Sequence, residues 1–331
     1  MATAQTRPPA VAGSAPQPSA LHPDPPGPPN SARRTTQTAT VAPGQNTSNQ
    51  RKYLWQTGFD HAKIATAFTE KFQHINRYDS RSIPNLQALL TMIEADATIR
   101  DIRWMAYMLA TAYWETSHIE TETVSSTDRR GRVITRNRNY WVNMTPAHET
   151  GEGAGRRYER PVKVLKLPSG KLTITEWNGN AFTVNLNGTF DAVVAGTVPG
   201  DVHPSGTPRP TRPSAAYVAA QGTEHAYFGR GYCQLTWWYN YATASALMNQ
   251  GLDYVIDPEK VMVPQPAYDL MSLCMREGKG FARPHKLADY FSGADRKYTQ
   301  ARAMINAGDN AATIATIAEA FEDVLWEARN Q

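Results

Sequence analysis

The chain is poor in cysteine, has no long apolar run and begins with a segment that lacks aromatic residues. Two cysteines are too few for a disulfide framework. No uninterrupted apolar run reaches the roughly 18 residues that a membrane-spanning helix requires, so we expect no insertion into a membrane. The N-terminus has no charged start followed by an apolar stretch, which argues against a secretory signal peptide.

The two cysteines also bear on the kind of site that the chain could hold. Cys233 and Cys274 do not have the spacing of metal ligands, so we expect no metal site. Free cysteine is among the most buried residue types. We therefore expect two buried thiols, and one disulfide between them stays open as the alternative.

Positive charge is concentrated in two segments. Residues 1–52 hold five basic residues against Asp24 and so carry the whole formal charge of +4. The rest of the chain is formally neutral, yet residues 129–171 hold eight arginines and three lysines against three glutamates. A segregated basic surface suits an anionic polymer, and a solvated charged loop is the alternative.

The start of the chain differs in composition from the remainder. Residues 1–50 hold 10 of the 23 prolines and no aromatic residue. Such a segment cannot bury enough apolar area to offset its chain entropy, so we predict a disordered tail. Folded sequence is expected from about Tyr53, as one domain over residues 51–331.

Most of this domain shows helical periodicity. Apolar residues recur at i, i+3, i+4 and i+7 from Leu86 to Ile93, behind a helix start at Ser82. A second stripe from Ile102 to Tyr113 brings Glu115 to the C-terminal end of its helix. Further helical patterns cover residues 238–250, 267–277 and 311–327. The predicted fold class is mainly α.

Residues 160–226 interrupt the helical pattern. Three β-prone runs, residues 163–167, 171–177 and 181–185, are separated by the turn sequences Pro-Ser-Gly and Asn-Gly-Asn. A loop rich in proline and glycine follows. We predict a small hairpin or three-stranded meander, inserted together with its loop into a helical protein.

The segment YFGRGYCQLTWWYNY, residues 227–241, has the composition of a sugar-binding site. Its paired glycines permit a tight backbone and the close approach of a ligand. Aromatic faces take the apolar faces of pyranose rings, while amide and hydroxyl groups bond hydroxyl and acetamido groups. The candidate contacts are Arg230, Gln234, Trp237, Tyr239 and Asn240. A structural turn followed by a core helix is the alternative.

Glutamates near this segment could supply acid–base chemistry. Glu115 ends the run WMAYMLATAYWE, among aromatic and aliphatic residues. Apolar surroundings disfavour the charged form of a carboxyl, which is how a general acid is kept protonated near neutral pH. A glycosidase needs a second carboxylate across its cleft, and Glu149, Glu152 and Glu159 lie in the stretch HETGEGAGRRYER.

Four stretches follow the order of one known pattern. They are LATAYWETSH with Trp114 where His is common, ETGEGAGRRY, FGRGYCQLTWWYNY, and AMINAG with Ala307 in place of a glycine. Together they resemble family 19 glycoside hydrolases, the chitinases and related peptidoglycan-cleaving endolysins of the lysozyme superfamily. The likeness extends with interruptions from about Tyr53 to Leu325, and the GRG segment is its most specific part.

The resemblance implies a lysozyme-like helical fold, no cofactor and hydrolysis with inversion at the anomeric carbon. It makes Glu115 the general acid, Glu149 the base that activates water, and Thr236 the residue that holds this water. It also places Gln234, Asn240 and Asn306 at sugar-binding positions.

The base is the less certain of the two carboxylates. An arginine-rich segment, residues 125–141, looks like an insertion between Glu115 and Glu149. Glu122, Glu152 and Glu159 therefore remain alternatives for this role.

The expected activity is that of an endo-acting β-1,4-glycosidase on a cell-wall polymer that contains N-acetylglucosamine. Peptidoglycan is preferred because it is anionic, and chitin is the alternative. A catalytically silent wall-binding or virion structural module is a second alternative, although such a module does not need paired carboxylates. We expect a monomer with a polysaccharide partner and no nucleic acid, made in the cytoplasm and released to the wall as phage or prophage endolysins are.

Overall fold

The computed structural model describes residues 53–55, 57–153, 162–166, 172–176, 181–184, 190–192, 227–250 and 253–330. The predicted tail, Glu159 and the loop that precedes Tyr227 lie outside these ranges. The disorder predicted for the tail therefore stays a prediction.

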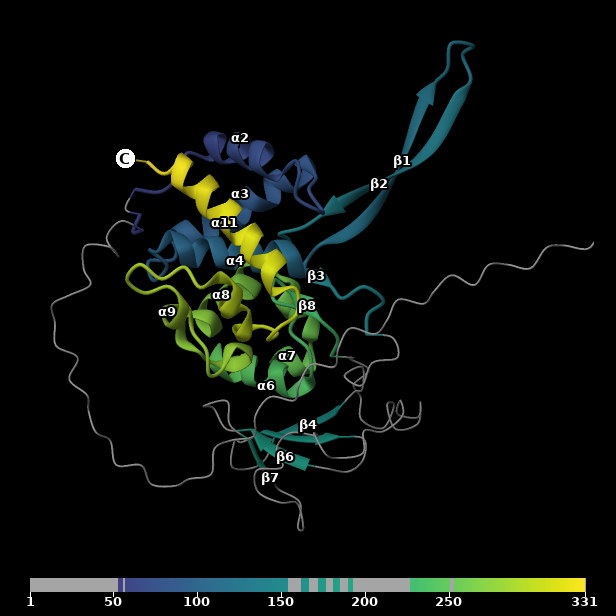
Figure 1. Cartoon of the computed structure of the whole chain (residues 1–331). Coiled ribbons are helices and arrows are strands. Elements are labelled where there is room, and N and C mark those ends of the chain that lie inside the picture. The colour runs from purple at the N-terminus through teal and green to yellow at the C-terminus, as the bar shows by residue number, and fades with distance from the viewer. Residues whose placement is uncertain are drawn as a thin grey trace, which may run out of the picture.

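The described residues form a mainly helical body, so the predicted class is confirmed (Figure 1). Its longer helices are α2 (His61–Phe72), α3 (Ile83–Ala95), α4 (Ile102–Glu115), α6 (Trp238–Leu247), α8 (Pro264–Glu277) and α11 (Ala311–Ala328). The short helices are α7 (Asp253–Ile256), α9 (Leu287–Tyr290) and α10 (Tyr298–Ala301), with the 3-10 turns η1 (Ser80–Ser82), η2 (Pro258–Met262), η3 (Gly280–Ala282) and η4 (Arg302–Met304). None of the helices in the described ranges is long and apolar enough to cross a membrane.

Helix α4 lies at the centre of this body. Its residues are buried from Ile102 to Tyr113, with Trp104 as the exception, and a helix that is apolar on nearly all sides belongs inside a fold. The C-terminal helix α11 packs on both α4 and α2 (Figure 1). The predicted stripe on α3, from Leu86 to Ile93, is buried against the same core.

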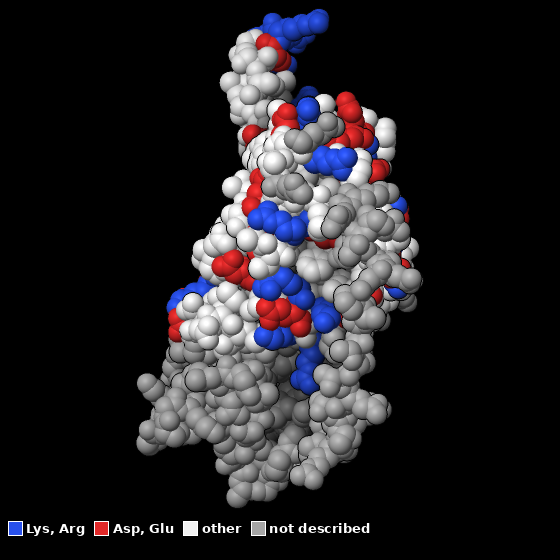
Figure 2. All heavy atoms as spheres, turned by 90° about the vertical axis from the view of Figure 1, so that its left-hand side faces the viewer, with Lys and Arg blue, Asp and Glu red and all other residues white. Residues whose placement is uncertain are grey.

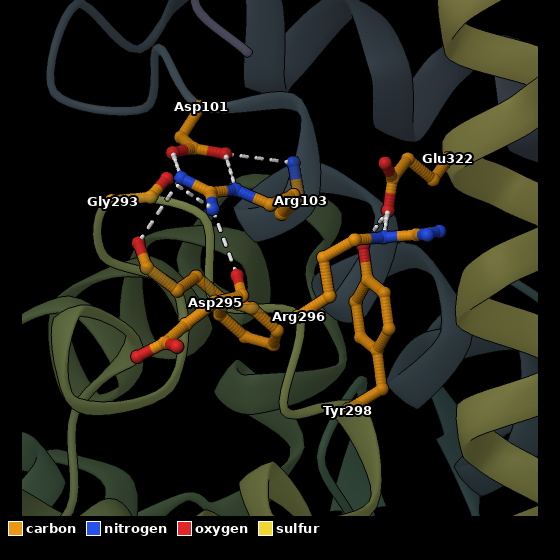
Figure 3. A network of polar contacts seen from close by, with 8 residues as sticks. Asp101, Arg103, Gly293, Asp295, Arg296, Tyr298 and Glu322 are labelled. Carbon is orange, nitrogen blue, oxygen red and sulfur yellow. Dashed lines mark hydrogen bonds and ion pairs between the residues drawn. The ribbon is translucent and has the colours of Figure 1, made fainter. Parts of the chain in front are cut away.

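The N-terminal end of α4 is fixed by a buried ion pair (Figure 3). Asp101 caps the helix by accepting from the backbone N–H of Arg103, and its carboxylate also takes two side-chain bonds from Arg103, at 2.9 and 2.6 Å. The Arg103 guanidinium donates further to the carbonyl oxygens of Gly293, Asp295 and Phe291. Each side chain of the pair is therefore paired on all sides, which a buried charge requires.

A long hairpin, β1 (His118–Thr127) and β2 (Val133–Val142), projects away from the helical body (Figure 1). Most of its side chains are exposed. The sequence pattern did not predict it, because neither strand has a buried face to impose an alternation of apolar and polar residues. Its base is held by Arg81 of η1, which pairs with Glu122 at 3.1 Å and lies 3.9 Å from the centre of the Tyr140 ring.

Two further sheets complete the described strands. Strand β3 (Ala147–His148) pairs antiparallel with β8 (Arg230–Gly231) and so joins two segments that are distant in the sequence. The strands β4 (Val162–Lys166), β5 (Leu172–Glu176), β6 (Ala181–Val184) and β7 (Phe190–Ala192) form an antiparallel meander. Its first three strands fall on the three predicted β-prone runs, and β7 adds a fourth strand.

Candidate functional site

Glu115 is the last residue of α4 and faces an arginine. Oε1 of its carboxylate lies 2.5 Å from Nη1 of Arg302, which belongs to η4. The side chain of Arg302 is only 2% exposed, whereas that of Glu115 is 15% exposed. Arg302 also donates from Nε to the carbonyl oxygen of Asp309, at 3.0 Å. One arginine thus holds one oxygen of Glu115, and the carboxylate still reaches solvent.

A row of polar side chains on α4 leads to this carboxylate. Tyr107, Thr111 and Glu115 are spaced by four residues and so share one helix face. Burial raises the pKa of the Tyr107 phenol, and the charges of Arg302 and Glu115 also act on it. Burial and then the charge of Glu115 raise the pKa of the Cys233 thiol well above its ordinary value. The charge of Glu115 therefore acts on the turn that contains Cys233.

That turn is a tight hairpin between Arg230 and Leu235. The two residues exchange backbone hydrogen bonds of 3.2 and 2.9 Å, and Gln234 has a φ of 51° at the bend. Gln234 donates its amide to the carbonyl of Ala147, at 2.9 Å, and so fixes the turn to β3. The aromatic- and amide-rich segment is thus a rigid turn that leads into α6.

Glu149 is held against the start of the same turn. Its backbone N–H donates to the carbonyl of Gly229 at 2.7 Å, and the N–H of Gly229 donates to its side-chain Oε2 at 3.0 Å. A Cβ on residue 229 would lie 2.6 Å from Oε1 of Gln234 and 3.2 Å from Cβ of Glu149. Only glycine leaves room for this arrangement, so Gly229 is required for the position of Glu149.

A third glutamate, Glu259, connects strands β3 and β8 next to Glu149. Glu259 of η2 accepts from His148 of β3 and from Arg230 of β8, each at 2.8 Å. Partial burial raises the pKa of Glu259, but the hydrogen bond from His148 and the charge of Arg230 outweigh it, so the pKa lies below its ordinary value. His148 and Arg230 are the neighbours of Glu149 and Gly229, and Glu259 therefore fixes both.

Three of the predicted residues keep acceptor atoms available. Gln234 and Asn240 donate their amides to the carbonyls of Ala147 and Thr236, so both side chains have fixed positions. Within the described ranges, no hydrogen bond engages the side-chain oxygens of Gln234 and Asn240 or the hydroxyl of Thr236. All three side chains are partly exposed and can meet a polar ligand.

The predicted contacts Arg230, Trp237 and Tyr239 have different surroundings. Arg230 is 4% exposed, pairs with Glu259, and lies 3.6 Å from the centre of the Phe228 ring, which favours a structural role over contact with sugar. Tyr239 is buried as well, and its ring stacks on that of Trp237 at 5.9 Å. Trp237 is half-buried, with its ring stacked on that of Tyr239.

Asn306 lies on the Arg302 side of the site. Its backbone N–H donates to the carbonyl of Arg302 at 2.9 Å, and its amide donates to Asp309 at 3.3 Å. The predicted acid and this predicted sugar contact are therefore linked through Arg302.

The alternative bases are placed less favourably than Glu149. Glu122 belongs to the projecting hairpin and pairs with Arg81. Glu152 is exposed, in a turn with a φ of 50°. Glu159 lies outside the described residues. Of the described candidates, only Glu149 is hydrogen-bonded to the turn that contains Cys233.

The two cysteines are not joined to each other, and one of them borders a small cavity. Cys233 and Cys274 are both free thiols, as preferred from the sequence, although Cys233 is only partly buried. A cavity of about 10 Å³ beside Cys233, lined also by Gly231 and Met271, has room for roughly one water molecule. In the part of the chain that the structure describes, no group of three or more His, Cys, Asp or Glu residues is placed to hold a metal ion.

Sequence reasoning missed Arg302 and Glu259, which hold Glu115 and the β3–β8 pair. Both contacts join distant parts of the chain, and no local pattern marks them. The chain matches no protein-family model, no curated protein and no solved structure.

Proposed function

We propose that the protein is a glycoside hydrolase with a lysozyme-like helical fold, which cleaves β-1,4-linked cell-wall polymer containing N-acetylglucosamine. One observation supports this proposal: Glu149 is hydrogen-bonded to the turn of residues 229–236, which offers the Gln234 amide and the Thr236 hydroxyl, and the charge of Glu115 acts on Cys233 of the same turn. A pair of carboxylates, one acting as acid and one as base, is what hydrolysis of a glycosidic bond with inversion needs. The central helix α4, which carries the acid at its end, is consistent with the lysozyme-like architecture.

In this proposal Glu115 is the general acid. Arg302 can only donate hydrogen bonds, and it faces Oε1, so the proton of the acid is carried by Oε2. This proton passes to the leaving glycosidic oxygen as the bond to the anomeric carbon breaks.

Glu149 is the base. It takes a proton from a water molecule, and the oxygen of that water attacks the anomeric carbon from the opposite side, which inverts its configuration. Thr236 orients this water with its hydroxyl, which has no other partner among the described residues. Gln234, Asn240, Asn306 and Trp237 bind the sugar units, and no cofactor takes part.

Digestion of two purified polymers tests the proposal. Purified protein is incubated with peptidoglycan and with chitin, and the soluble products are analysed by mass spectrometry. Release of disaccharide-peptides from peptidoglycan is the expected result, and release of N-acetylglucosamine oligomers from chitin alone would make the protein a chitinase. Binding to the wall without any soluble product would favour the silent module.

A further inference from the structure

The β1–β2 hairpin has two faces of different chemistry. Side chains alternate between the faces of a strand, so the register assigns each residue to one of them. The ladder face holds Ile119, Thr121, Thr123, Ser125, Thr127, Val133, Thr135, Asn137, Asn139 and Trp141. The arginine face holds His118, Glu120, Glu122, Val124, Ser126, Ile134, Arg136, Arg138, Tyr140 and Val142. The ladder face has no charged residue.

The polar groups of the ladder face bond with one another. Thr121 donates to Asn139 at 2.8 Å, Thr123 donates to Asn137 at 3.1 Å, and the next hydroxyl pair across the strands lies at 3.3 Å. Cross-strand pairs of this kind stabilise a hairpin. The polar side chains of the ladder face therefore stabilise the hairpin.

The outer part of the arginine face and the turn carry cations that have no partner among the described residues. Arg136 and Arg138 are neighbours on one face, about 7 Å apart along the strand. Arg129 and Arg130 lie in the turn, and basic side chains mark the far end of the hairpin in Figure 2. All four are exposed, and the described residues give none of them an ion pair or hydrogen bond through its side chain. Arg132, by contrast, pairs with Asp128 at 2.9 Å.

The acidic residues of the hairpin are already engaged. Glu120 accepts from Tyr140 at 2.7 Å, Glu122 pairs with Arg81, and Asp128 closes the turn. Residues 118–142 hold five arginines against Glu120, Glu122 and Asp128, so the arm carries a formal net charge of +2 along strands that extend roughly 30 Å.

The base of the arm adjoins the proposed acid. The guanidinium of Arg77 lies 3.7 Å from the centre of the Trp114 ring and 5.6 Å from that of Trp141. Trp114 immediately precedes Glu115, and Trp141 lies in β2. A polymer that follows the arm from its turn to its base would thus reach the side of the body that carries the proposed acid, Glu115.

We infer that the hairpin is a binding arm for peptidoglycan, in which Arg129, Arg130, Arg136 and Arg138 pair with the carboxylates of the stem peptides. The choice of polymer rests on the proposed function, but binding by the arm does not depend on catalysis. Charge complementarity favours peptidoglycan as the bound polymer, because chitin carries no carboxylate. The ladder face is uncharged, and its polar side chains bond with one another.

Binding by the arm is measured by sedimentation of the full-length protein with purified peptidoglycan. Every protein compared carries Glu115→Gln, so that the polymer stays intact; this variant alone is the background. Changing all four arginines to Gln should weaken binding roughly tenfold at low salt, while changing them to Lys should alter it less than about twofold. A conservative variant of the ladder face, Thr123→Ser, keeps the hydroxyl that bonds to Asn137 and should bind as the background does. The basic tail is the same in every variant, so its contribution cancels.

A second set of binding measurements varies the polymer. Peptidoglycan whose carboxyls have been converted to amides should bind the background and the Gln variant equally weakly. Equal binding of both proteins to native peptidoglycan would overturn the inference. So would arginine-dependent binding to chitin, to duplex DNA or to anionic lipid vesicles that exceeds the binding to peptidoglycan. None of these outcomes depends on whether the wild-type protein hydrolyses the polymer.

Discussion

The two ends of helix α4 each hold an arginine beside a carboxylate, and the two pairs differ in what else they touch. At the N-terminal end, Arg103 and Asp101 bond through two side-chain contacts, and three carbonyl oxygens take the remaining donors. At the C-terminal end, Arg302 holds a single oxygen of Glu115. Asp101 is 4% exposed and Glu115 is 15% exposed.

The difference separates a fully enclosed ion pair from one that, in the proposed function, takes part in the reaction. A carboxylate whose oxygens are both engaged inside the protein can stabilise the fold but cannot reach a substrate. A carboxylate held at one oxygen keeps a fixed position and still offers the other oxygen to a ligand. The same two residue types therefore close the fold at one end of α4 and expose a functional group at the other.

The largest effect on stability is expected at the closed end. Asp101→Asn leaves the fully buried charge of Arg103 without its counter-charge, which should cost about 3 to 5 kcal/mol in the free energy of unfolding. Urea unfolding followed by tryptophan fluorescence measures this loss. Asp295→Asn is the matched control: its carboxylate pairs with Lys297 at the surface, so less than about 1 kcal/mol should be lost. Equal losses of stability for Asp101→Asn and Asp295→Asn would contradict the structural role of the buried pair.

A smaller loss of stability is expected when Arg302 is substituted. Arg302→Gln removes the ion pair with Glu115 and the bond to the Asp309 carbonyl, and should lower the free energy of unfolding by about 1.5 to 3 kcal/mol. Arg302→Lys keeps the charge but not the planar set of donors, so its activity on cell wall should fall between those of the parent and of Arg302→Gln. If Arg302→Gln hydrolyses the wall as fast as the parent, the arginine does not position the acid.

The smallest effect concerns Glu259 and depends on pH. Its pKa is lowered in the fold, so its carboxylate stabilises the protein above the ordinary pKa, and this contribution is lost as the pH falls through the folded value. Glu259→Gln should be less stable than the parent by up to about 1 kcal/mol at pH 7, because the carboxylate is half-exposed. The difference should shrink toward pH 3.

Glu319→Gln is the control for this titration. Glu319 is exposed on α11 and makes no side-chain bond or ion pair within the described residues. Its substitution should leave the pH dependence of the melting temperature unchanged. A difference between Glu259→Gln and the parent that grows on acidification would contradict the assigned role of Glu259.

The elements that the sequence predicted are those with a local pattern. The stripes on α3, α4 and α11 could be found because a buried helix face repeats along the chain, and Glu115 was placed at the end of α4 for this reason. Strands β4, β5 and β6 were found from β-prone runs between turn sequences. The β1–β2 hairpin was not, because two exposed strands show no burial period.

The contacts that the sequence could not predict are those between distant segments. The approach of Arg302 to Glu115 and the clamp of Glu259 on His148 and Arg230 depend on how helices and turns meet in space. Apolar neighbours along α4 suggested an acid among apolar walls, whereas the structure adds a buried arginine at its side. Arg230 was predicted as a sugar contact from its glycine neighbours, and its burial against Phe228 was not visible there.

The proposed role of Glu115 as general acid is tested most directly by two measurements on the variant Glu115→Gln. The amide cannot donate a proton as an acid does. Among the described residues, it also leaves the buried guanidinium of Arg302 with only the carboxylate of Asp309, 3.9 Å away, as counter-charge, so the variant should remain folded but melt several degrees below the parent. Its rate of clearing a cell-wall suspension should fall by about 10²- to 10⁴-fold. Retention of more than about a tenth of the parent rate by the folded variant would contradict the assignment of Glu115 as the general acid.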